Sequence, residues 1–328
     1  MKLGYKIIIG VVSFILIFLL VCNVIPPKKS VEENPFITGE TMLCAHRGGK
    51  INFPENTLLA YQESVRLYDV EILETDLYLT KDNYLVLNHD EYINRTCDVE
   101  EVLGSPDKYY IRDHTLDELK QFNFGYKFTK NNETPYKELV SLTDDIEYRK
   151  QVIAENRLSI VTLNDLFEAF YEDRPDMLFI VEIKDEAERG YFAADLIADI
   201  LEQYPLYKNR IVVGTFHDEI GEYLEKEHPG IMRGASWGAA KKYVITQMFK
   251  VNIFENQTFG CLQLPEEALG FNLTKKTYIR RAHRRNIAVQ YWTINDEDTM
   301  RMLIEKGCDA IMTDDPELLR KVLNDYNM

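Results

Sequence analysis

The sequence predicts an α/β domain folded as a TIM (β/α)8 barrel, with a hairpin inserted after the second strand and a transmembrane helix before the domain. From residue 42 onward, short apolar runs bounded by turn residues alternate with segments whose apolar residues recur every three or four positions. Parallel strands need crossover connections, which helices commonly supply, so this alternation is typical of a TIM barrel. An open, doubly wound sheet is the alternative, but no G-x-G-x-x-G motif follows the first apolar run.

The expected strands are short apolar runs flanked by turn residues. They cover residues 42–45, 71–76, 178–183, 210–214, 231–235, 260–264, 287–293 and 309–313. The expected helices lie between most of these strands and carry their apolar residues on one face. They cover residues 57–67, 163–171, 191–203, 219–227, 274–285 and 297–306.

The hairpin is predicted at residues 77–88, where a tight-turn sequence at 81–83 separates two strand-like runs. Such a hairpin would return His89 to the end of the barrel that carries Glu74 and Asp76. Residues 104–156 are polar and aromatic, with one convincing helix near 116–122. We expect this segment to form an irregular excursion over the barrel mouth.

Length and composition favour a single large domain. The chain has 328 residues, and about 290 remain when the apolar N-terminal segment is set aside. No Gly/Ser or Pro tract divides the chain. We therefore expect a membrane anchor at residues 1–27, a polar linker at 28–40 and one barrel domain at 41–328. The oligomeric state is left open.

The anchor is predicted from the uncharged segment 7–25, which at 1.5 Å per helical residue spans roughly 28 Å, close to the ~30 Å hydrocarbon core. Two prolines follow it, and the small-x-small pattern of a signal-peptide cleavage site is missing. Lys2 and Lys6 precede the segment, which favours a cytoplasmic N-terminus. The sequence thus predicts a single-pass protein of the cell membrane with an extracytoplasmic catalytic domain.

The net charge of −16 indicates what the protein acts on. A surface this acidic repels a polyphosphate backbone, and no concentrated basic stripe is present, so nucleic-acid binding is not expected. A small anion can still bind where a cation or local Lys and Arg side chains offset the charge.

Ionisable residues gather at the ends of the predicted strands, where TIM barrels carry their catalytic groups. Glu74 and Asp76 are two residues apart, so both carboxylates lie on one face of a strand. Glu182 ends the next barrel strand, and three converging carboxylates would repel one another unless a cation lies between them. Hard oxygen ligands suit Ca²⁺ or Mg²⁺, so we expect one divalent cation there.

His46 and His89 each end a strand-like run that faces the proposed cation. A pair of imidazoles at one site can supply both proton transfers of a hydrolysis, one as base and one as acid. The sequence does not order the two roles, although we favour His89 as the base. Arg47 and Lys184 would neutralise phosphate oxygens, and they could also pair with the site carboxylates.

The order of these motifs resembles the glycerophosphodiester phosphodiesterase family. The resemblance rests on the following residues: His46-Arg47-Gly48, Pro54-Glu55-Asn56-Thr57, Glu74-Thr75-Asp76, His89-Asp90, Arg95-Thr96, Thr162-Leu163, Glu182-Ile183-Lys184, Trp292-Thr293-Ile294-Asn295 and Thr313-Asp314-Asp315-Pro316. It covers about residues 42–319 in order. The set is specific, although residues 128–156 and the strand ending Gly214-Thr215-Phe216-His217 depart from the family pattern.

The resemblance implies a metal-dependent TIM-barrel enzyme that hydrolyses glycerophosphodiesters to glycerol 3-phosphate and an alcohol. It implies that Glu74, Asp76 and Glu182 are metal ligands and that His46 and His89 are the general acid and base. It further implies phosphate contacts from Arg47 and Lys184, a supporting carboxylate at Glu55 and a pocket-lining aromatic at Trp292. The head group on the alcohol is not implied.

Two other functions remain open. A phospholipase C- or D-like enzyme on a similar barrel could act on lysolipids or intact lipids at the membrane, and an exposed apolar rim at the mouth would favour it. A membrane-tethered binding protein with an inactive site is the second alternative, which the loss of a histidine or carboxylate would favour. None of these residues is missing from the sequence.

Overall fold

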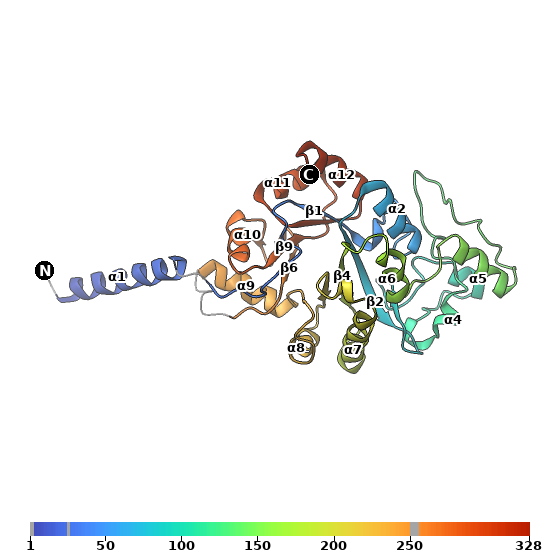
Figure 1. Ribbon diagram of the computed structural model, residues 1–328, viewed down its shortest axis with the longest axis horizontal. Coiled ribbons are helices and arrows are strands. Elements are labelled where there is room, and N and C mark those ends of the chain that lie inside the picture. The colour runs from blue at the N-terminus through green and yellow to red at the C-terminus, as the bar shows by residue number, and fades with distance from the viewer. Residues whose placement is uncertain (1–2, 25–26, 250–255) are drawn as a thin grey trace.

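The computed structural model describes residues 3–24, 27–249 and 256–328 (Figure 1). The strands are β1 (Met42–Ala45), β2 (Ile72–Leu79), β3 (Leu85–Leu87), β4 (Leu178–Ile183), β5 (Ile211–Gly214), β6 (Cys261–Leu264), β7 (Glu267–Ala268), β8 (Phe271–Asn272), β9 (Ala288–Tyr291) and β10 (Ala310–Thr313). The helices are α1 (Leu3–Val24), α2 (Leu58–Tyr68), α3 (Val99–Leu103), α4 (Leu116–Leu119), α5 (Ile146–Glu155), α6 (Leu163–Tyr171), α7 (Ala187–Gln203), α8 (Asp218–Glu227), α9 (Trp237–Phe249), α10 (Lys276–His283), α11 (Glu297–Lys306) and α12 (Pro316–Asp325). Short 3-10 turns cover His46–Gly48, Ile111–Asp113 and Pro205–Tyr207.

The central sheet is a nearly closed parallel barrel. Its strand order is β5-β4-β2-β1-β10-β9-β6, and every neighbouring pair in this series is parallel. The chain between β5 and β6 joins the two edges, because parallel bridges connect Val213 with Arg233 and Gly234 with Cys261. The predicted TIM barrel is therefore confirmed, including the strand position expected at residues 231–235.

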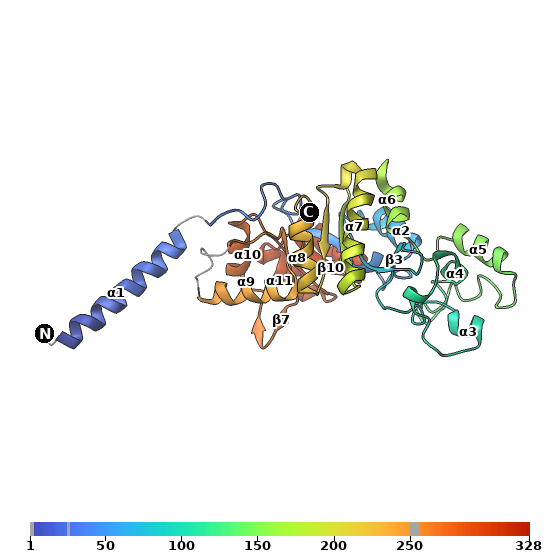
Figure 2. The same cartoon turned by 90° about the horizontal axis from the view of Figure 1, so that it is seen from below.

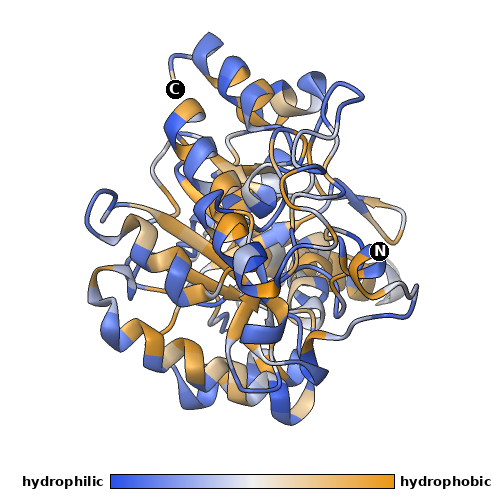
Figure 3. Cartoon of the chain, turned by 90° about the vertical axis from the view of Figure 1, so that its right-hand side faces the viewer, coloured by the Kyte–Doolittle hydropathy of each residue, from blue (hydrophilic) through white to orange (hydrophobic). Residues whose placement is uncertain are grey.

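The strands alternate between two apolar layers. Along β2, Leu73 packs in the large core between the sheet and its helices, whereas Ile72 packs in the smaller cluster inside the barrel. On β4, Phe179 and Ile180 divide in the same way. Figure 3 shows hydrophobic residues concentrated in the central strands and hydrophilic residues on the outer faces of the helices. The inward positions thus form a separate column of residues that ends at the barrel mouth.

Helix starts follow local capping chemistry. The Thr57 hydroxyl accepts a hydrogen bond from the Ala60 N–H and so caps α2. At α6, Thr162 and Asp165 form a reciprocal capping box. Such caps satisfy N–H groups that have no partner within the helix, which explains why α6 and α11 begin close to the predicted boundaries.

The predicted hairpin after the second strand is also present. β3 pairs antiparallel with β2, in the register Leu77 to Leu87 and Leu79 to Leu85. Asn83 has a φ of 66°, which suits the turn that joins the two strands. The following excursion forms a lobe beside the barrel that carries α3, α4 and α5 (Figures 1 and 2). Its core cluster includes Ile93, Phe122 and Ile160.

The N-terminal prediction needs a correction. A helix does form at α1, and it projects away from the barrel in both views. Within the described residues, however, no helix is both long and apolar enough to cross a membrane. The transmembrane helix predicted at residues 7–25 is therefore not supported, and the prolines expected to end it begin at a residue outside the described part of the chain. The predicted extracytoplasmic location is not tested by the structure and stays a prediction.

The segment predicted as a linker packs against the barrel. The Ser30 hydroxyl donates to the Phe259 carbonyl at 2.5 Å, and Asn34 Nδ2 donates to the Gly260 carbonyl at 2.8 Å. Phe36 is fully buried in the apolar cluster inside the barrel, together with Met42. This segment therefore covers the end of the barrel opposite the ionisable strand ends.

Candidate active site

A cavity of about 580 Å³ opens at the carboxyl ends of the barrel strands. Residues from most barrel strands and from α9 line it, which agrees with the usual place of active sites in this architecture. Its lining divides into an ionisable part and an apolar part. The ionisable part comprises His46, Arg47, Glu74, Asp76, His89, Glu182 and Lys184.

The inward column of each strand explains this arrangement. On β2 the inward side chains are, in order, Ile72, Glu74 and Asp76. On β4 the apolar Ile180 is followed on the same face by Glu182. Residues two apart on a strand share a face. The barrel interior is therefore apolar at the amino ends of the strands and charged at the carboxyl ends.

The turn after β1 depends on glycine. Arg47, Gly48 and Gly49 have φ values of 53°, 80° and 86°. A Cβ on Gly48 would come within 2.8 Å of the Ala60 side chain, so only glycine fits the approach of this turn to α2. Arg47 itself adopts the left-handed conformation that L-residues rarely occupy, which turns its guanidinium towards Asp76 and Glu55.

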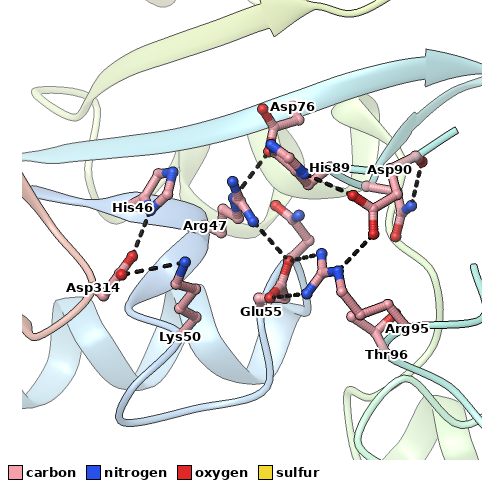
Figure 4. A network of polar contacts seen from close by, with 12 residues as sticks. His46, Arg47, Lys50, Glu55, Asp76, His89, Asp90, Arg95, Thr96 and Asp314 are labelled. Carbon is pink, nitrogen blue, oxygen red and sulfur yellow. Dashed lines mark hydrogen bonds and ion pairs between the residues drawn. The ribbon is translucent and has the colours of Figure 1, made fainter. Parts of the chain in front are cut away.

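His46 is held by an aspartate from the neighbouring strand. β1 and β10 pair with Ala45 opposite Thr313, so the next residues, His46 and Asp314, lie side by side. His46 Nδ1 lies 2.5 Å from Asp314 Oδ1, as Figure 4 shows. Burial is the main cause that lowers the pKa of His46, and Arg47 adds to it. A neutral ring whose Nδ1–H is donated to Asp314 leaves Nε2 as a proton acceptor.

Three carboxylates and one ammonium group share the centre of the site. β2 and β4 pair with Asp76 opposite Glu182. Lys184 Nζ lies 2.9 Å from Asp76 Oδ1 and 2.6 Å from Glu182 Oε1. Glu74 Oε2 accepts a hydrogen bond from the Arg47 backbone N–H at 2.9 Å.

Burial and like charge disturb the ionisation of this group. Burial raises the pKa of Glu74 well above its usual value, and repulsion from Asp76 raises it further. Burial likewise raises the pKa of Glu182. Burial alone would lower the pKa of Lys184, but Asp76 and Glu182 outweigh it and raise that pKa, which favours the charged ammonium form. The three carboxylates in the ionisable part of the cavity thus outnumber its two cationic side chains, Arg47 and Lys184.

His89 belongs to a chain of ion pairs that reaches Arg47 (Figure 4). His89 Nδ1 lies 2.8 Å from Asp90 Oδ1, and Arg95 Nε donates to Asp90 Oδ2 at 2.5 Å. Arg95 also makes a bidentate pair with Glu55, both bonds at 2.7 Å, and Glu55 Oε1 lies 3.3 Å from Arg47. The hydrogen bond from His89 is the main reason that the pKa of Asp90 is far below its usual range.

The carboxylates of the site bear on the predicted divalent cation. Among the described residues, no group of three or more His, Cys, Asp or Glu side chains is arranged to hold a metal ion. The chemistry of the donor set nevertheless suits one, because the carboxylates of Glu74, Asp76 and Glu182 line one cavity, where Asp76 and Glu182 are paired with Arg47 and Lys184. The metal site predicted at Glu74, Asp76 and Glu182 stays a prediction.

The apolar part of the cavity begins at two aromatic rings. Phe216 and Trp292 both line the cavity and meet edge to face with their ring centroids 6.0 Å apart. Lys184 Nζ lies 5.7 Å from the Phe216 ring centroid, so the rings adjoin the ionisable part. Beyond them the lining continues over α9 and the β7–β8 hairpin.

The structure brings most of the predicted site residues together. His46, His89, Arg47, Lys184, Trp292, Glu74, Asp76 and Glu182 all line the one cavity. Glu55 does not line it, and instead holds Arg47 and Arg95 from behind. Sequence reasoning missed Asp314, Asp90 and Arg95 as site residues, although all three belong to the motifs that carried the resemblance. Asp314 follows β10, and it reaches His46 because β10 pairs with β1.

Comparison with known proteins gives one family. The model of the glycerophosphoryl diester phosphodiesterase family matches residues 46–318. A glycerophosphodiester phosphodiesterase of Caldanaerobacter subterraneus is 25% identical over 280 residues, which is 85% of this chain and 96% of the relative. One of Bacillus subtilis is 22% identical over 318 residues, covering 95% of this chain and 97% of the relative.

Solved structures show the same fold. A phosphodiesterase of Oleispira antarctica, in complex with its product sn-glycerol-3-phosphate, superposes with a TM-score of 0.62 at 19% identity, covering 89% of this chain and 100% of that chain. A glycerophosphodiester phosphodiesterase of Thermotoga maritima gives a TM-score of 0.57 at 22% identity, covering 86% of this chain and 98% of that chain.

Proposed function

Because the chain belongs to the glycerophosphoryl diester phosphodiesterase family, we propose that it hydrolyses glycerophosphodiesters to glycerol 3-phosphate and an alcohol. The observation that carries this proposal is the pair of imidazoles in one cavity, each with its Nδ1 on a carboxylate. The same cavity contains the guanidinium of Arg47 and the ammonium group of Lys184, which can bind the non-bridging oxygens of a phosphodiester.

The surroundings of the two histidines suggest different roles for them. His46 is buried and its pKa is lowered, and Asp314 holds the proton on Nδ1, so Nε2 can take a proton from the attacking hydroxyl. His89 Nδ1 contacts Asp90, whose pKa is far below its usual range, and we assign to this second imidazole the protonation of the leaving oxygen. We therefore assign the base to His46, in place of the His89 favoured from the sequence.

Either of two nucleophiles can use this pair. A free hydroxyl of the glycerol could attack phosphorus and give a cyclic phosphate, or water could attack directly. In both cases the base and acid act on opposite oxygens of the phosphorus, and Arg47 and Lys184 stabilise charge on the remaining two. Lys184 would exchange part of its contact with Asp76 for the phosphate when substrate binds.

One divalent cation, Ca²⁺ or Mg²⁺, forms part of the proposal. Glu74, Asp76 and Glu182 would hold it, and their burial and mutual repulsion support this, since a cation would offset both. When bound, it would supply further stabilisation of negative charge on the phosphate oxygens. The residues around it would still perform the proton transfers.

The alternatives considered from the sequence gain no support from the comparisons. The relatives of Caldanaerobacter and Bacillus subtilis carry phosphodiesterase names. An inactive binding protein would also have no need for two histidines placed on carboxylates in one cavity.

A substrate panel tests the proposal. Glycerophosphocholine, glycerophosphoethanolamine and glycerophosphoglycerol are incubated with the purified protein in Ca²⁺, Mg²⁺ or chelator, and glycerol 3-phosphate and the free alcohol are quantified. We expect equimolar release of both products from at least one diester. Failure to cleave every diester with every cation, by a protein shown to be folded, would contradict the proposal.

A further inference from the structure

We propose that the side-chain amide of Gln263, on β6, binds a free hydroxyl group of the substrate's glycerol and so determines the specificity for glycerol-bearing diesters. Gln263 lines the same cavity as the ionisable residues. This inference rests on the proposed function for the position of the phosphate. It goes further by naming a specificity residue and the chemical group that it recognises.

The barrel wall is charged on one side of the mouth and neutral on another. β2 and β4 carry the carboxylates of Glu74 and Glu182 on their inward faces. Along β5, residues 231–235 and β6, the inward residues that follow the apolar cluster inside the barrel are Gly214, Gly234 and Gln263. Gln263 therefore supplies the polar side chain of the neutral wall.

The two glycines make room for the Gln263 side chain. A Cβ on Gly234 would lie 2.8 Å from Gln263 Oε1, and a Cβ on Gly214 would lie 3.4 Å from the same atom. The amide thus reaches from β6 across residues 231–235 as far as β5. Gly214 is the partner of Glu182 in the register of β5 and β4, so the amide ends beside the ionisable part of the cavity.

The amide of Gln263 is available to a ligand. Within the part of the chain that the structure describes, no group shares a hydrogen bond with it, although it lines the cavity. Gln290, its partner in the register of β6 and β9, is 1% exposed, and its Oε1 accepts no hydrogen bond from any described residue. Because buried amides are normally satisfied, this layer of the barrel has hydrogen-bonding capacity for a polar ligand.

The chemistry of an amide matches a hydroxyl group. A primary amide offers both donors and an acceptor, and a hydroxyl group likewise donates and accepts. Phosphate oxygens accept and are better bound by Arg47 and Lys184, whereas an ammonium group donates and is better bound by the carboxylates. Glycerol is the part that all glycerophosphodiesters share, and its free hydroxyl groups lie close to the phosphate. Gln263 beside the ionisable part is placed to recognise one of them.

Binding of the product tests this recognition without turnover. Both tryptophans of the chain, Trp237 and Trp292, line the cavity, so intrinsic fluorescence reports on it. Glycerol 3-phosphate and propyl phosphate, which lacks the hydroxyl groups, are titrated in the same Ca²⁺-containing buffer. We expect glycerol 3-phosphate to bind about tenfold more tightly, as the hydrogen bonds of an amide to a hydroxyl group allow. Equal affinity for the two phosphates would overturn the inference.

A matched pair of variants locates the preference. Gln263→Leu keeps a side chain of similar size and removes its hydrogen-bonding groups, so we expect the preference to fall to about twofold or less with propyl phosphate binding retained. Gln203→Leu makes the same change at the exposed end of α7, outside the cavity, and should keep the full preference. A tenfold preference that survives in Gln263→Leu would contradict the assignment.

A second pair moves the amide without altering it. Gly234→Ala brings a methyl group within 2.8 Å of Gln263 Oε1, which lies at the end of a flexible side chain, so the amide must shift while the fold can remain. Gly214→Ala leaves the same atom at 3.4 Å, an ordinary contact distance. Neither glycine has a positive φ. We expect the preference to be lost in Gly234→Ala and largely kept in Gly214→Ala, with similar melting temperatures. The opposite order would overturn the inference.

Turnover distinguishes the glycerol from the leaving alcohol. Glycerophosphocholine and glycerophosphoglycerol are hydrolysed by the unaltered protein and by Gln263→Leu. We expect kcat/KM to fall by about tenfold for both diesters, because both carry glycerol. A loss confined to glycerophosphoglycerol would place the contact on the hydroxyl groups of the alcohol and overturn the assignment to glycerol.

The same measurements separate this inference from the proposed function. Cleavage of both diesters that is unaffected by Gln263→Leu would overturn the role of Gln263 and leave the proposed function intact. A binding preference that depends on Gln263, without cleavage of either diester, would support the role of Gln263 and contradict the proposed function.

Discussion

At the scale of single residues, the assignment of His46 as the base depends on Asp314. Its carboxylate holds the imidazole at 2.5 Å and is itself held by Asn295 Nδ2 at 2.9 Å and by Lys50 at 3.2 Å. These contacts outweigh burial and lower the pKa of Asp314, so the carboxylate stays ionised. An ionised aspartate fixes the tautomer of the ring and stabilises the imidazolium that forms during reaction.

Asp314→Asn should therefore lower kcat by about 10²–10⁴-fold with little change in thermal stability, because an amide can hold the ring in the wrong tautomer. Steady-state kinetics together with a melting curve measure both quantities. Lys50→Met removes a different partner of Asp314 and leaves His46 in place, so it serves as the control. Equal kcat losses in the two variants would show that general damage to the site, and not the tautomer, is responsible.

How far the sequence predicts the site can be judged from two residues. His46 and Glu74 were found because strand ends in a TIM barrel carry ionisable groups, and both line the cavity. Asp314 was missed because its role depends on β10 lying beside β1, a contact between residues more than 260 positions apart. Local periodicity predicts that a strand exists but not which strand it pairs with.

At the scale of secondary-structure elements, one buried ion pair ties the lobe together. Arg149 on α5 is paired with Asp98, the residue before α3, at 2.5 Å, and both side chains are almost fully buried. Arg149 also donates to the Ser141 carbonyl at 2.6 Å, and Asp98 accepts from the Asn123 N–H at 2.9 Å. Four segments of the excursion thus meet at this pair.

Arg149→Met should destabilise the protein by about 3–5 kcal/mol, because it leaves the Asp98 carboxylate buried without its cation. Denaturant unfolding of the variant measures this value. Lys208→Met, which breaks an exposed pair with Glu202, should cost at most about 1 kcal/mol. Similar losses of unfolding free energy in the two variants would mean that the buried ion pair contributes no more to stability than the exposed one.

A second ion pair joins α10 to the sheet and gives stability a pH dependence. His283 Nε2 lies 2.7 Å from Asp309 Oδ2, which also accepts the Val289 N–H at 2.7 Å. The hydrogen bond to Asp309 raises the pKa of His283 above its usual value. Its contribution is complete below about pH 6.5, the unfolded value, and is lost as pH rises through the higher folded value.

We therefore expect the free energy of unfolding to contain a component that falls as pH rises above about 6.5, and His283→Gln should remove that component. Denaturant unfolding of both proteins between pH 5 and 9 measures the difference. If the difference in unfolding free energy between the two proteins is the same at every pH from 5 to 9, protonation of His283 is not linked to folding.

Helices with one apolar face were predicted unevenly: α6 and α11 were found, whereas α12, which buries Leu319, Val322 and Leu323, was not predicted. α6 and α11 bury a clear stripe, and both were found at their observed bounds. α9 was missed, because it buries Tyr243 and Val244 while presenting Ile245 and Met248 on its exposed side. A helix that lines a cavity as well as a core carries apolar residues around much of its circumference, which hides the periodicity.

At the scale of the whole molecule, the barrel couples its stability to the charge at its mouth. The carboxylates of Glu74, Asp76 and Glu182 lie together at the barrel mouth, and a divalent cation bound between them would offset their mutual repulsion. We expect saturating Ca²⁺ or Mg²⁺ to raise the melting temperature by roughly 5 °C. Glu74→Gln should reduce this rise, whereas Glu63→Gln, on α2, should leave it unchanged. Identical shifts in both variants would place the cation elsewhere.

The fold as a whole was predictable because the alternation of strands and helices repeats around the barrel. What could not be predicted is where the N-terminal segments lie. Phe36 plugs the barrel end through contacts with residues from several strands, and no local pattern around it indicates that partner. The membrane-spanning helix was predicted from local apolarity alone, and among the described residues no helix meets the requirements for crossing a bilayer.

The most direct test of the paired-histidine hydrolysis is the turnover of a glycerophosphodiester by His46→Gln and His89→Gln. Each proton-transfer group contributes about 10²–10⁴-fold, so kcat should fall by at least roughly 10²-fold in each variant. The melting temperature and its response to divalent cations should stay close to those of the unaltered protein. Near-normal turnover in either variant would contradict the paired-histidine mechanism.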